Sequence, residues 1–361
     1  NVILISVESL SAKFMKIFGS TKNITPYLDK LLETSLLFNN FYATGTRTVR
    51  GLESIALAIP PTPGQAIVRR EDNKGFHSMG NVFREHGYES VFFYGGNGFF
   101  DNMNDFFSGN IYSIIYKKNL ANEEISFENA WGVSDEDLFN RSLKEADQIF
   151  EKKQNFFYHI MTVSNHKPYS YPDNKIDIPS LLSRDGAVKY TDFAIGKFIE
   201  KAKEKQWYSN TIFVIVADHC ASIAGKIGLD VNSYHIPLII HCPSLIKAGE
   251  ISKVSSQIDI APTLFKLLSF KYKNYFLGDD ILSDNFKERA FISNYDKMGY
   301  LKNNILCVLS LRRVVDFYSY NGTEVKPLKT PDQNILEETM AYYQGIDYIL
   351  EHRMFRITPA P

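Results

Sequence analysis

The stretch NVILISVE, residues 1–8, decides the fold class, because an uncharged and mainly apolar run leads directly into the carboxylate of Glu8. A continuous apolar run of this length is typical of a strand buried on both faces of a parallel sheet. A second such run, NTIFVIVADHC at residues 210–220, ends in Asp218 and His219. The sequence therefore predicts two buried strands that each carry polar side chains at their carboxyl ends.

Apolar runs and helical patterns alternate through most of the chain. This alternation is the signature of a mostly parallel sheet with helices on both faces. Apolar residues at helical spacing predict helices, and short apolar runs bounded by turn residues predict strands. The further expected strands lie at residues 88–96, 155–164 and 235–243, and the expected helices at 24–38, 76–87, 185–205 and 259–268.

The pattern changes after about residue 288. Short strand-like runs with turn residues between them follow, and the periodic stretch at residues 334–354 predicts a closing helix. We therefore predict an α/β protein with a central, mostly parallel sheet flanked by helices and a small β-rich C-terminal subdomain. The expected division is a catalytic domain at residues 1–287 and a C-terminal subdomain at residues 288–361.

Composition excludes several classes of protein. The 361 residues have a formal net charge of −1, and the lysines and arginines are spread without the basic stripe that nucleic-acid binding requires. The three cysteines, Cys220, Cys242 and Cys307, are too few and too widely spaced for a disulfide framework or a zinc motif, so we expect buried free thiols.

No run of about 18 apolar residues is present, which excludes a spanning helix within this sequence. The chain begins directly on a core strand, and we expect that a segment precedes it in the parent protein.

Glu8, Asp218 and His219 are the first candidate site. Functional groups of open α/β sheets gather at the carboxyl ends of the strands, so two parallel neighbouring strands would bring these three side chains together. Two carboxylates and one imidazole suit Zn²⁺ or Mn²⁺, and the ligand types do not choose between them. The alternative is structural: a helix-capping carboxylate in each case and a packed histidine.

Thr48 is the second candidate, in the stretch RTVRGLES at residues 47–54. A threonine hydroxyl is a weak nucleophile that a metal or the amino end of a helix can activate. The stretch that follows Thr48 predicts a helix, so the hydroxyl could also serve only as its cap.

Several motifs, in this order along the chain, resemble the lipoteichoic acid synthase-like phosphoglycerol transferases of the alkaline phosphatase and sulfatase superfamily. The resemblance covers roughly residues 1–320. The motifs are NVILISVESL, ITPYLDKL, FNNFYATGTRTVRGLES, FFYGGNGFFDNM, TVSNHKPY, ADHC and FISNYDKMGY.

The resemblance implies roles for individual residues. Glu8, Asp218 and His219 match the metal ligands of the family, and Thr48 matches its nucleophile, which also contacts the metal. His166 matches a histidine of the substrate pocket. The resemblance implies one divalent cation, with Mn²⁺ as the first choice and Mg²⁺ or Zn²⁺ as alternatives. It also implies N-terminal membrane helices in the parent protein and a catalytic domain on the extracytoplasmic, periplasmic side of the cell membrane.

The stretch YGGNGFFDNM, at residues 94–103, is expected to line the substrate pocket. In the synthases that polymerise glycerol phosphate, this region supplies a tryptophan and an arginine, whereas here it has Phe and Asn, so the transferred group is open. Arg47 and Arg50 could hold a phosphate. ADHC departs from the usual glycine after the histidine, and Cys220 could narrow that loop. The residues expected to bind substrate are Tyr94, Asn97, Phe100, Asn102 and Arg50.

The expected reaction is transfer of a phospholipid head group through a phosphothreonine at Thr48. The donor resembles phosphatidylglycerol, and the acceptor is a glycan, a lipid or water. Three alternatives remain: a phosphoethanolamine transferase, which commonly has several disulfides; a phosphodiesterase or sulfatase-type hydrolase; and a non-catalytic lipid-binding domain. RTVRG lacks both the Cys or Ser and the Pro that a formylglycine sulfatase requires.

Overall fold

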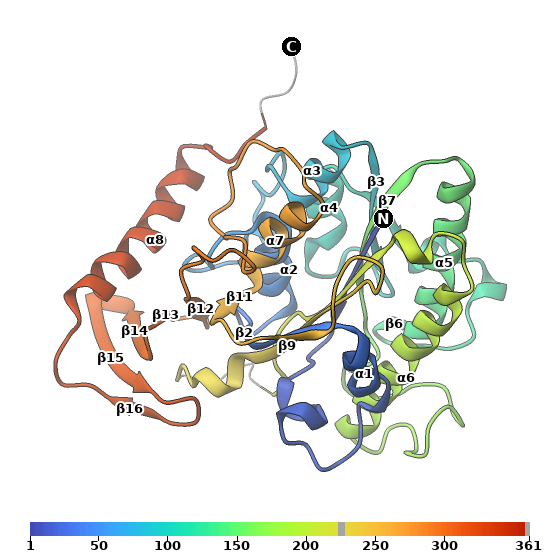
Figure 1. Cartoon of the computed structure of the whole chain (residues 1–361), viewed down its shortest axis with the longest axis horizontal. Coiled ribbons are helices and arrows are strands. Elements are labelled where there is room, and N and C mark those ends of the chain that lie inside the picture. Colours follow the sequence, from blue (N-terminus) through green and yellow to red (C-terminus); the bar gives the residue numbers. More distant parts are fainter. Residues whose placement is uncertain (223–227, 358–361) are drawn as a thin grey trace.

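Figure 1 shows a computed structural model of the chain, which describes residues 1–222 and 228–357. Within these residues, nine strands form the main sheet in the order β10–β2–β9–β8–β1–β7–β3–β4, with β11 beside β2. All pairs are parallel except those made by β9, which confirms a mostly parallel sheet. The strands are β1 Val2–Val7, β2 Leu36–Tyr42, β3 Tyr88–Tyr94, β4 Ser113–Tyr116, β7 Asn155–Met161, β8 Ile212–Ala217, β9 His235–His241, β10 Gly249–Ile251 and β11 Ser255–Ser256.

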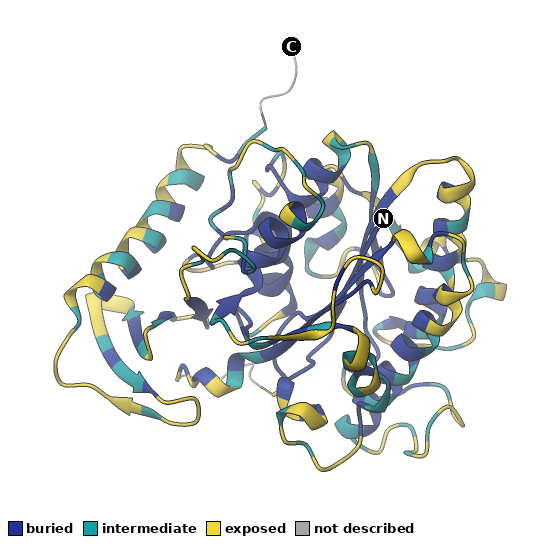
Figure 2. Ribbon diagram, in the orientation of Figure 1, coloured by how far each residue is buried: buried dark blue, intermediate teal, exposed yellow. Residues whose placement is uncertain are grey.

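Helices cover the sheet on both sides (Figure 1), and the strands between them are buried (Figure 2). The first layer consists of α1 Pro26–Leu31, α5 Asp135–Glu151 and α6 Arg184–Lys203, and α6 contacts both of the others. The second layer includes α2 Thr48–Leu57, α3 Met79–Glu85, α4 Met103–Gly109 and α7 Ile260–Leu267. A small hairpin, β5 Glu128–Asn129 and β6 Gly132–Val133, precedes α5. No helix in the described part of the chain is long and apolar enough to cross a membrane.

The C-terminal strands form a separate antiparallel sheet, as the sequence predicts. The closing helix α8 Gln333–Glu351 packs against β13 and β14 at one end of the molecule, on the left of Figure 1. The Ser293 hydroxyl donates a hydrogen bond of 2.8 Å to the Thr44 carbonyl, which links this sheet to the loop before α2. The strands are β12 Ala290–Ser293, β13 Lys297–Lys302, β14 Ile305–Ser310, β15 Val314–Tyr320 and β16 Val325–Pro327.

The helix predicted at residues 24–38 is wrong in its second half. The helix begins at Pro26, as expected for proline in a first turn, but α1 ends at Leu31 and β2 begins at Leu36. Leu36 pairs with Ile240 of β9, and Phe38 is fully buried in the sheet. Strand pairing and burial therefore override the helical spacing of these leucines.

The helix predicted at residues 76–87 is shorter than expected, for a local reason. The side chains of Ser78 and Asn81 form a capping box, so α3 starts at Met79. Gly87 has a φ of +80° directly after the helix, which ends it. The three cysteines are free and buried, which confirms that prediction.

Candidate active site

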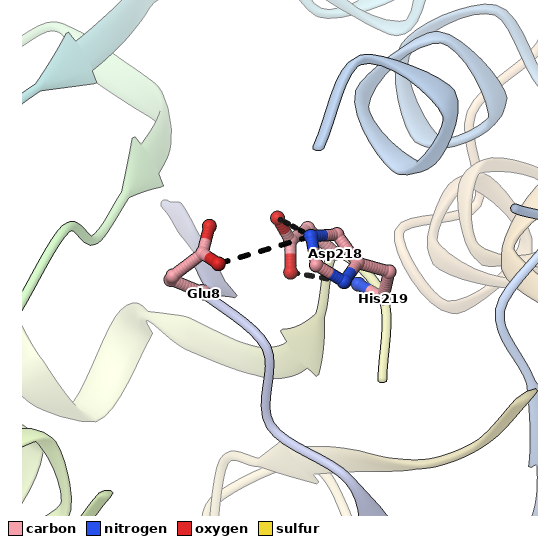
Figure 3. Close-up of side chains that lie close together, drawn as sticks. All are labelled: Glu8, Asp218 and His219. Carbon is pink, nitrogen blue, oxygen red and sulfur yellow. Dashed lines mark hydrogen bonds and ion pairs between the residues drawn. The ribbon is translucent and has the colours of Figure 1, made fainter. Parts of the chain in front are cut away.

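The metal-ligand candidates come together because β1 and β8 are parallel neighbours. Val7 pairs with Ala217, so the next residues of both strands project from the same edge of the sheet. One oxygen or nitrogen atom from each of Glu8, Asp218 and His219 lies within 4.8 Å of the others. The His219 Nε2 is 3.4 Å from Asp218 Oδ2 and 3.8 Å from Glu8 Oε1 (Figure 3).

Ser9 connects the two carboxylates, and the sequence analysis missed it. Its backbone N–H donates to Asp218 Oδ1 at 2.8 Å, and its hydroxyl donates to Glu8 Oε1 at 2.5 Å. This geometry holds Ser9 at a φ of +52°, a conformation that is uncommon for a residue other than glycine. The adjacent Asn165 donates from Nδ2 to the Glu8 carbonyl at 2.9 Å. In the sequence, only their positions next to Glu8 and His166 indicated that Ser9 and Asn165 could belong to the site.

Thr48 is the first residue of α2, and its hydroxyl donates to Glu8 Oε2 at 3.3 Å. Arg47 occupies the N-cap position, so the interpretation of Thr48 as the cap is wrong. The helix approaches the sheet closely because of Gly51, where an added Cβ would lie 2.1 Å from the Asp218 carbonyl oxygen. The threonine hydroxyl therefore joins the carboxylate and imidazole group.

The pKa values of the two buried carboxylates are shifted in opposite directions. Burial, followed by the charge of Glu8, raises the pKa of Asp218 to about 7. Burial acts to raise the pKa of Glu8 as well. The hydrogen bond from His166 and the charges of His219 and His166 outweigh it, so the pKa of Glu8 is lowered. One carboxylate is thus strongly ionised while the other takes up a proton near neutral pH.

A divalent cation fits this group. Asp218 Oδ2 is buried and has no hydrogen-bond partner among the described residues, which is costly for a carboxylate oxygen. Two carboxylates and one imidazole are donors that Mn²⁺ and Zn²⁺ accept, and carboxylates also suit Mg²⁺.

His166 also contacts Glu8, with its Nε2 3.3 Å from Glu8 Oε2, the oxygen that accepts from the Thr48 hydroxyl. Burial lowers the pKa of His166, but the hydrogen bond and charge of Glu8 outweigh this effect and raise it. Trp131 stacks on the imidazole at a centroid distance of 3.9 Å, and Phe100 contacts Trp131 edge-on at 5.5 Å. Trp131 thus joins His166 and Phe100 in one aromatic cluster. The sequence analysis had not identified Trp131 as part of the site.

The other residues predicted to bind substrate are dispersed. Tyr94 is buried at the end of β3, and its pKa is raised by burial and then by the charge of Glu8. Asn97 is exposed. Asn102 donates from Nδ2 to the Val68 carbonyl at 3.4 Å.

Arg50 is held in a buried ion pair with Glu53, at 2.7 Å between Nη1 and Oε1, and contacts the Gly64 carbonyl. Its guanidinium therefore holds the loop after α2. Arg50 also lines a cavity of about 400 Å³ beside the start of α2. The cavity is lined by Thr46, Arg47, Val49, Arg50, Gly64, Gln65, Ala66, Arg69, Ser293, Asn294 and Tyr295.

Comparisons with known proteins show the family of this chain. The family model named sulfatase matches residues 1–270. The lipoteichoic acid synthase-like YvgJ of Bacillus subtilis is 25% identical over 81% of this chain and 51% of its own length. Lipoteichoic acid synthase 2 of the same organism is 26% identical over 82% of this chain and 49% of its own. The chain thus spans about half the length of these curated relatives.

Two solved structures share the fold. An alkaline phosphatase superfamily protein from Vibrio parahaemolyticus superposes with a TM-score of 0.93 and 34% identity, covering 99% of this chain and 88% of that one. The lipoteichoic acid synthase LtaP from Listeria monocytogenes gives a TM-score of 0.83 and 21% identity, covering 100% and 93%. These similarities agree with the expected fold class.

Proposed function

The chain belongs to the sulfatase family of the alkaline phosphatase superfamily, and from this premise we propose that it is a metal-dependent phosphoglycerol transferase. One observation carries the proposal: the Thr48 hydroxyl lies 3.3 Å from Glu8, within the buried group that also contains Asp218 and His219. A buried threonine hydroxyl among ionisable groups is the arrangement that nucleophilic phosphoryl transfer requires.

Glu8, Asp218, His219 and Thr48 are the proposed ligands of one divalent cation, with Mn²⁺ as the first choice and Mg²⁺ or Zn²⁺ as alternatives. When bound, the cation supplies Lewis-acid stabilisation of the charge that develops at the threonine oxygen and the phosphate.

In the first step, the Thr48 hydroxyl attacks the phosphorus of a phosphodiester head group. Its proton passes to solvent water, because Glu8 and Asp218 must stay ionised as proposed ligands of the cation. The bond between phosphorus and the lipid oxygen breaks, and the leaving oxygen takes a proton from His166, whose raised pKa favours the protonated form. The products are a diacylglycerol and a glycerophosphoryl ester of Thr48.

In the second step, an acceptor hydroxyl gives its proton to His166 and attacks the phosphothreonine. The bond between Thr48 and phosphorus breaks, and the threonine oxygen recovers a proton from solvent water. Each residue thus returns to its starting state, which satisfies the proton balance of the full cycle.

The donor in this proposal is a phospholipid resembling phosphatidylglycerol, and the acceptor is a glycan, a lipid or water. The names of the relatives, which include lipoteichoic acid synthases, support this choice. The catalytic part would comprise residues 1–287 with residues 288–361 as a C-terminal subdomain. The parent protein would be anchored in the cell membrane with this part on its extracytoplasmic side.

The competing reactions are less well supported. Thr48 stands where a formylglycine sulfatase requires Cys or Ser, and the three free cysteines differ from the disulfides expected of phosphoethanolamine transferases. Hydrolysis of a phosphodiester is the same two-step reaction with water as the acceptor.

The experiment compares phosphatidylglycerol with phosphatidylethanolamine in mixed vesicles with Mn²⁺, and measures the diacylglycerol released. We expect release from phosphatidylglycerol, and a loss of at least about 1,000-fold in Thr48→Ala. Thr48→Ser, which keeps a hydroxyl at this position, is the matched control and should retain measurable turnover. Equal release by Thr48→Ala and the parent protein would refute the proposal, and release only from phosphatidylethanolamine would reassign the donor.

A further inference from the structure

Gln257 is fully buried and connects two segments of the candidate active site that are distant in the sequence. Its Nε2 donates hydrogen bonds of 2.8 Å to the carbonyls of Ala217 and Asp218, at the end of β8. Its Oε1 accepts from the backbone N–H of Thr44 at 2.9 Å and from the Thr44 hydroxyl at 3.0 Å. The side-chain amide therefore uses both of its donor hydrogens and both acceptor positions of its oxygen.

The partners of Gln257 match a glutamine better than its nearest relatives. A backbone N–H can only donate and a carbonyl can only accept, so these partners fix the orientation of the amide. A glutamate would place a carboxylate oxygen against the carbonyls of Ala217 and Asp218. An asparagine is one methylene shorter and cannot reach both sides. Since a buried polar group without a partner is costly, neither replacement keeps both connections.

The Thr44 side of this bridge leads to the nucleophile. Thr44 lies four residues before Thr48, and its hydroxyl is 2.8 Å from Ser54 Oγ of α2. An added Cβ on Gly45 would lie 2.4 Å from the Arg50 Cβ, so the segment that leads to Thr48 packs closely on the helix. The bridge thus holds the segment that enters α2 against the end of β8.

Both ends of the bridge are supported from the C-terminal sheet. Gln257 begins the 3-10 turn Gln257–Asp259, and the buried Asp259 carboxylate accepts from two nitrogens of Arg289, at 2.8 and 2.9 Å. Arg289 directly precedes β12, and Ser293 of β12 donates to the Thr44 carbonyl at 2.8 Å. A side chain whose surroundings are fixed in this way can hold other groups precisely.

We propose that Gln257 is a positioning residue that sets the distance between the Thr48 hydroxyl and the strand end that carries Asp218 and His219. Its side chain has no exposed surface, so it cannot touch substrate and acts only through Thr44 and the end of β8. This inference deepens the proposed function and rests on it for the role of Thr48. Reacting groups misplaced by about 1 Å lose on the order of 100-fold in rate, so a spacer of this kind controls turnover.

The kinetic test is Gln257→Glu, which keeps the shape of the side chain and loses both donors. We expect kcat for diacylglycerol release to fall at least about tenfold while KM stays within about threefold, because only the geometry of the reacting groups changes. Thr263→Val is the matched control. The buried Thr263 hydroxyl also makes two hydrogen bonds, to the Asp259 carbonyl and from the Ile281 N–H, so its removal should lower stability and leave kcat unchanged.

A second measurement follows the position of residue 48 without turnover. In Thr48→Cys loaded with Co²⁺, a thiolate that reaches the cation gives a charge-transfer absorption, separate from the weaker visible bands of the bound ion. We expect Gln257→Glu to remove the charge-transfer absorption and to keep the visible bands, because the other ligands remain. This result in a protein that turns over no lipid would support the positioning role and refute only the proposed function.

Two results would overturn the positioning role. One is a fall in kcat for Gln257→Glu no larger than that for Thr263→Val, and the other is an unchanged charge-transfer absorption. If Gln257→Glu does not fold, Gln257→Asn decides in the same two assays. It keeps an uncharged amide but is too short for both connections, so a rate and an absorption equal to those of the parent would contradict the proposal.

Discussion

Replacing Gly51 by alanine tests whether the approach of α2 to the sheet sets the position of the nucleophile. Gly51 lies one turn after Thr48, against the backbone of Asp218. An alanine Cβ would lie 2.1 Å from the Asp218 carbonyl oxygen and 2.8 Å from its carbonyl carbon. The neighbouring atoms belong to the backbone at a strand end, so no side chain can rotate away.

The size of the effect follows from these distances. Ordinary contact begins near 3.4 Å, so α2 or the Asp218 backbone must move by about 1.3 Å. A displacement of about 1 Å between reacting groups costs on the order of 100-fold in rate. The helix propensity of alanine favours the variant by only about 1 kcal/mol, and the overpacking costs about 1–3 kcal/mol. We therefore expect a folded but less stable protein with about 100-fold lower turnover.

The assay is diacylglycerol release from phosphatidylglycerol vesicles, with unfolding in denaturant measured on the same preparations. Gly345→Ala is the matched control, because Gly345 also lies within a helix but an added Cβ meets no atom within 4 Å. It should gain about 0.4–1 kcal/mol of stability and keep full activity. Turnover of Gly51→Ala within a factor of two of the parent would refute the reasoning.

Three further predictions concern charge and metal binding. Burial raises the pKa of Asp192 from 3.8 to about 7, so the folded protein holds a proton that the unfolded chain releases, and stability is lost as the pH rises through this window. Denaturant titrations should therefore show Asp192→Asn gaining up to roughly 4 kcal/mol relative to the parent between pH 4 and 7, and a constant difference would contradict this. Ser9→Ala removes the hydroxyl that donates to Glu8 and should weaken Mn²⁺ binding by about 10-fold in calorimetry, whereas unchanged affinity would exclude a positioning role. Because Asp218 must lose its proton to bind a cation, Mn²⁺ affinity should fall by up to about tenfold per pH unit below pH 7, and a flat profile between pH 8 and 6 would argue against Asp218 as a ligand.

The sequence predicted the strands correctly where every residue of the strand is buried. The runs that became β1 and β8 are uncharged and almost entirely apolar, and their lack of alternation correctly indicated strands covered on both faces. The stretch at residues 24–38 misled because its leucines fit both a helix and a strand. Leu36 and its neighbours join β9, which lies about 200 residues later in the chain, and no local pattern contains that information.

Some residues of the candidate site could likewise be predicted from the sequence, and others could not. Glu8 and Asp218 could be brought together by a general rule on strand ends, which required only the correct prediction of two parallel strands. Trp131 could not, because it lies in the turn of a short hairpin that meets His166 only in the folded chain.

For Arg50, in contrast, the sequence itself indicated the partner with which it forms an ion pair. Glu53 follows at a spacing of three residues within a helix, which favours an ion pair on one helix face. Weighing that spacing would have indicated a structural ion pair before a phosphate ligand.

The most direct measurement is mass spectrometry of the peptide that contains Thr48, after brief incubation with phosphatidylglycerol and Mn²⁺ and rapid acid quenching. The account predicts a glycerophosphoryl adduct on Thr48 that forms before acceptor is added, disappears when acceptor is supplied, and is absent from Thr48→Ala. Lipid turnover with no modified Thr48, or with the adduct on another residue such as His166, would contradict it.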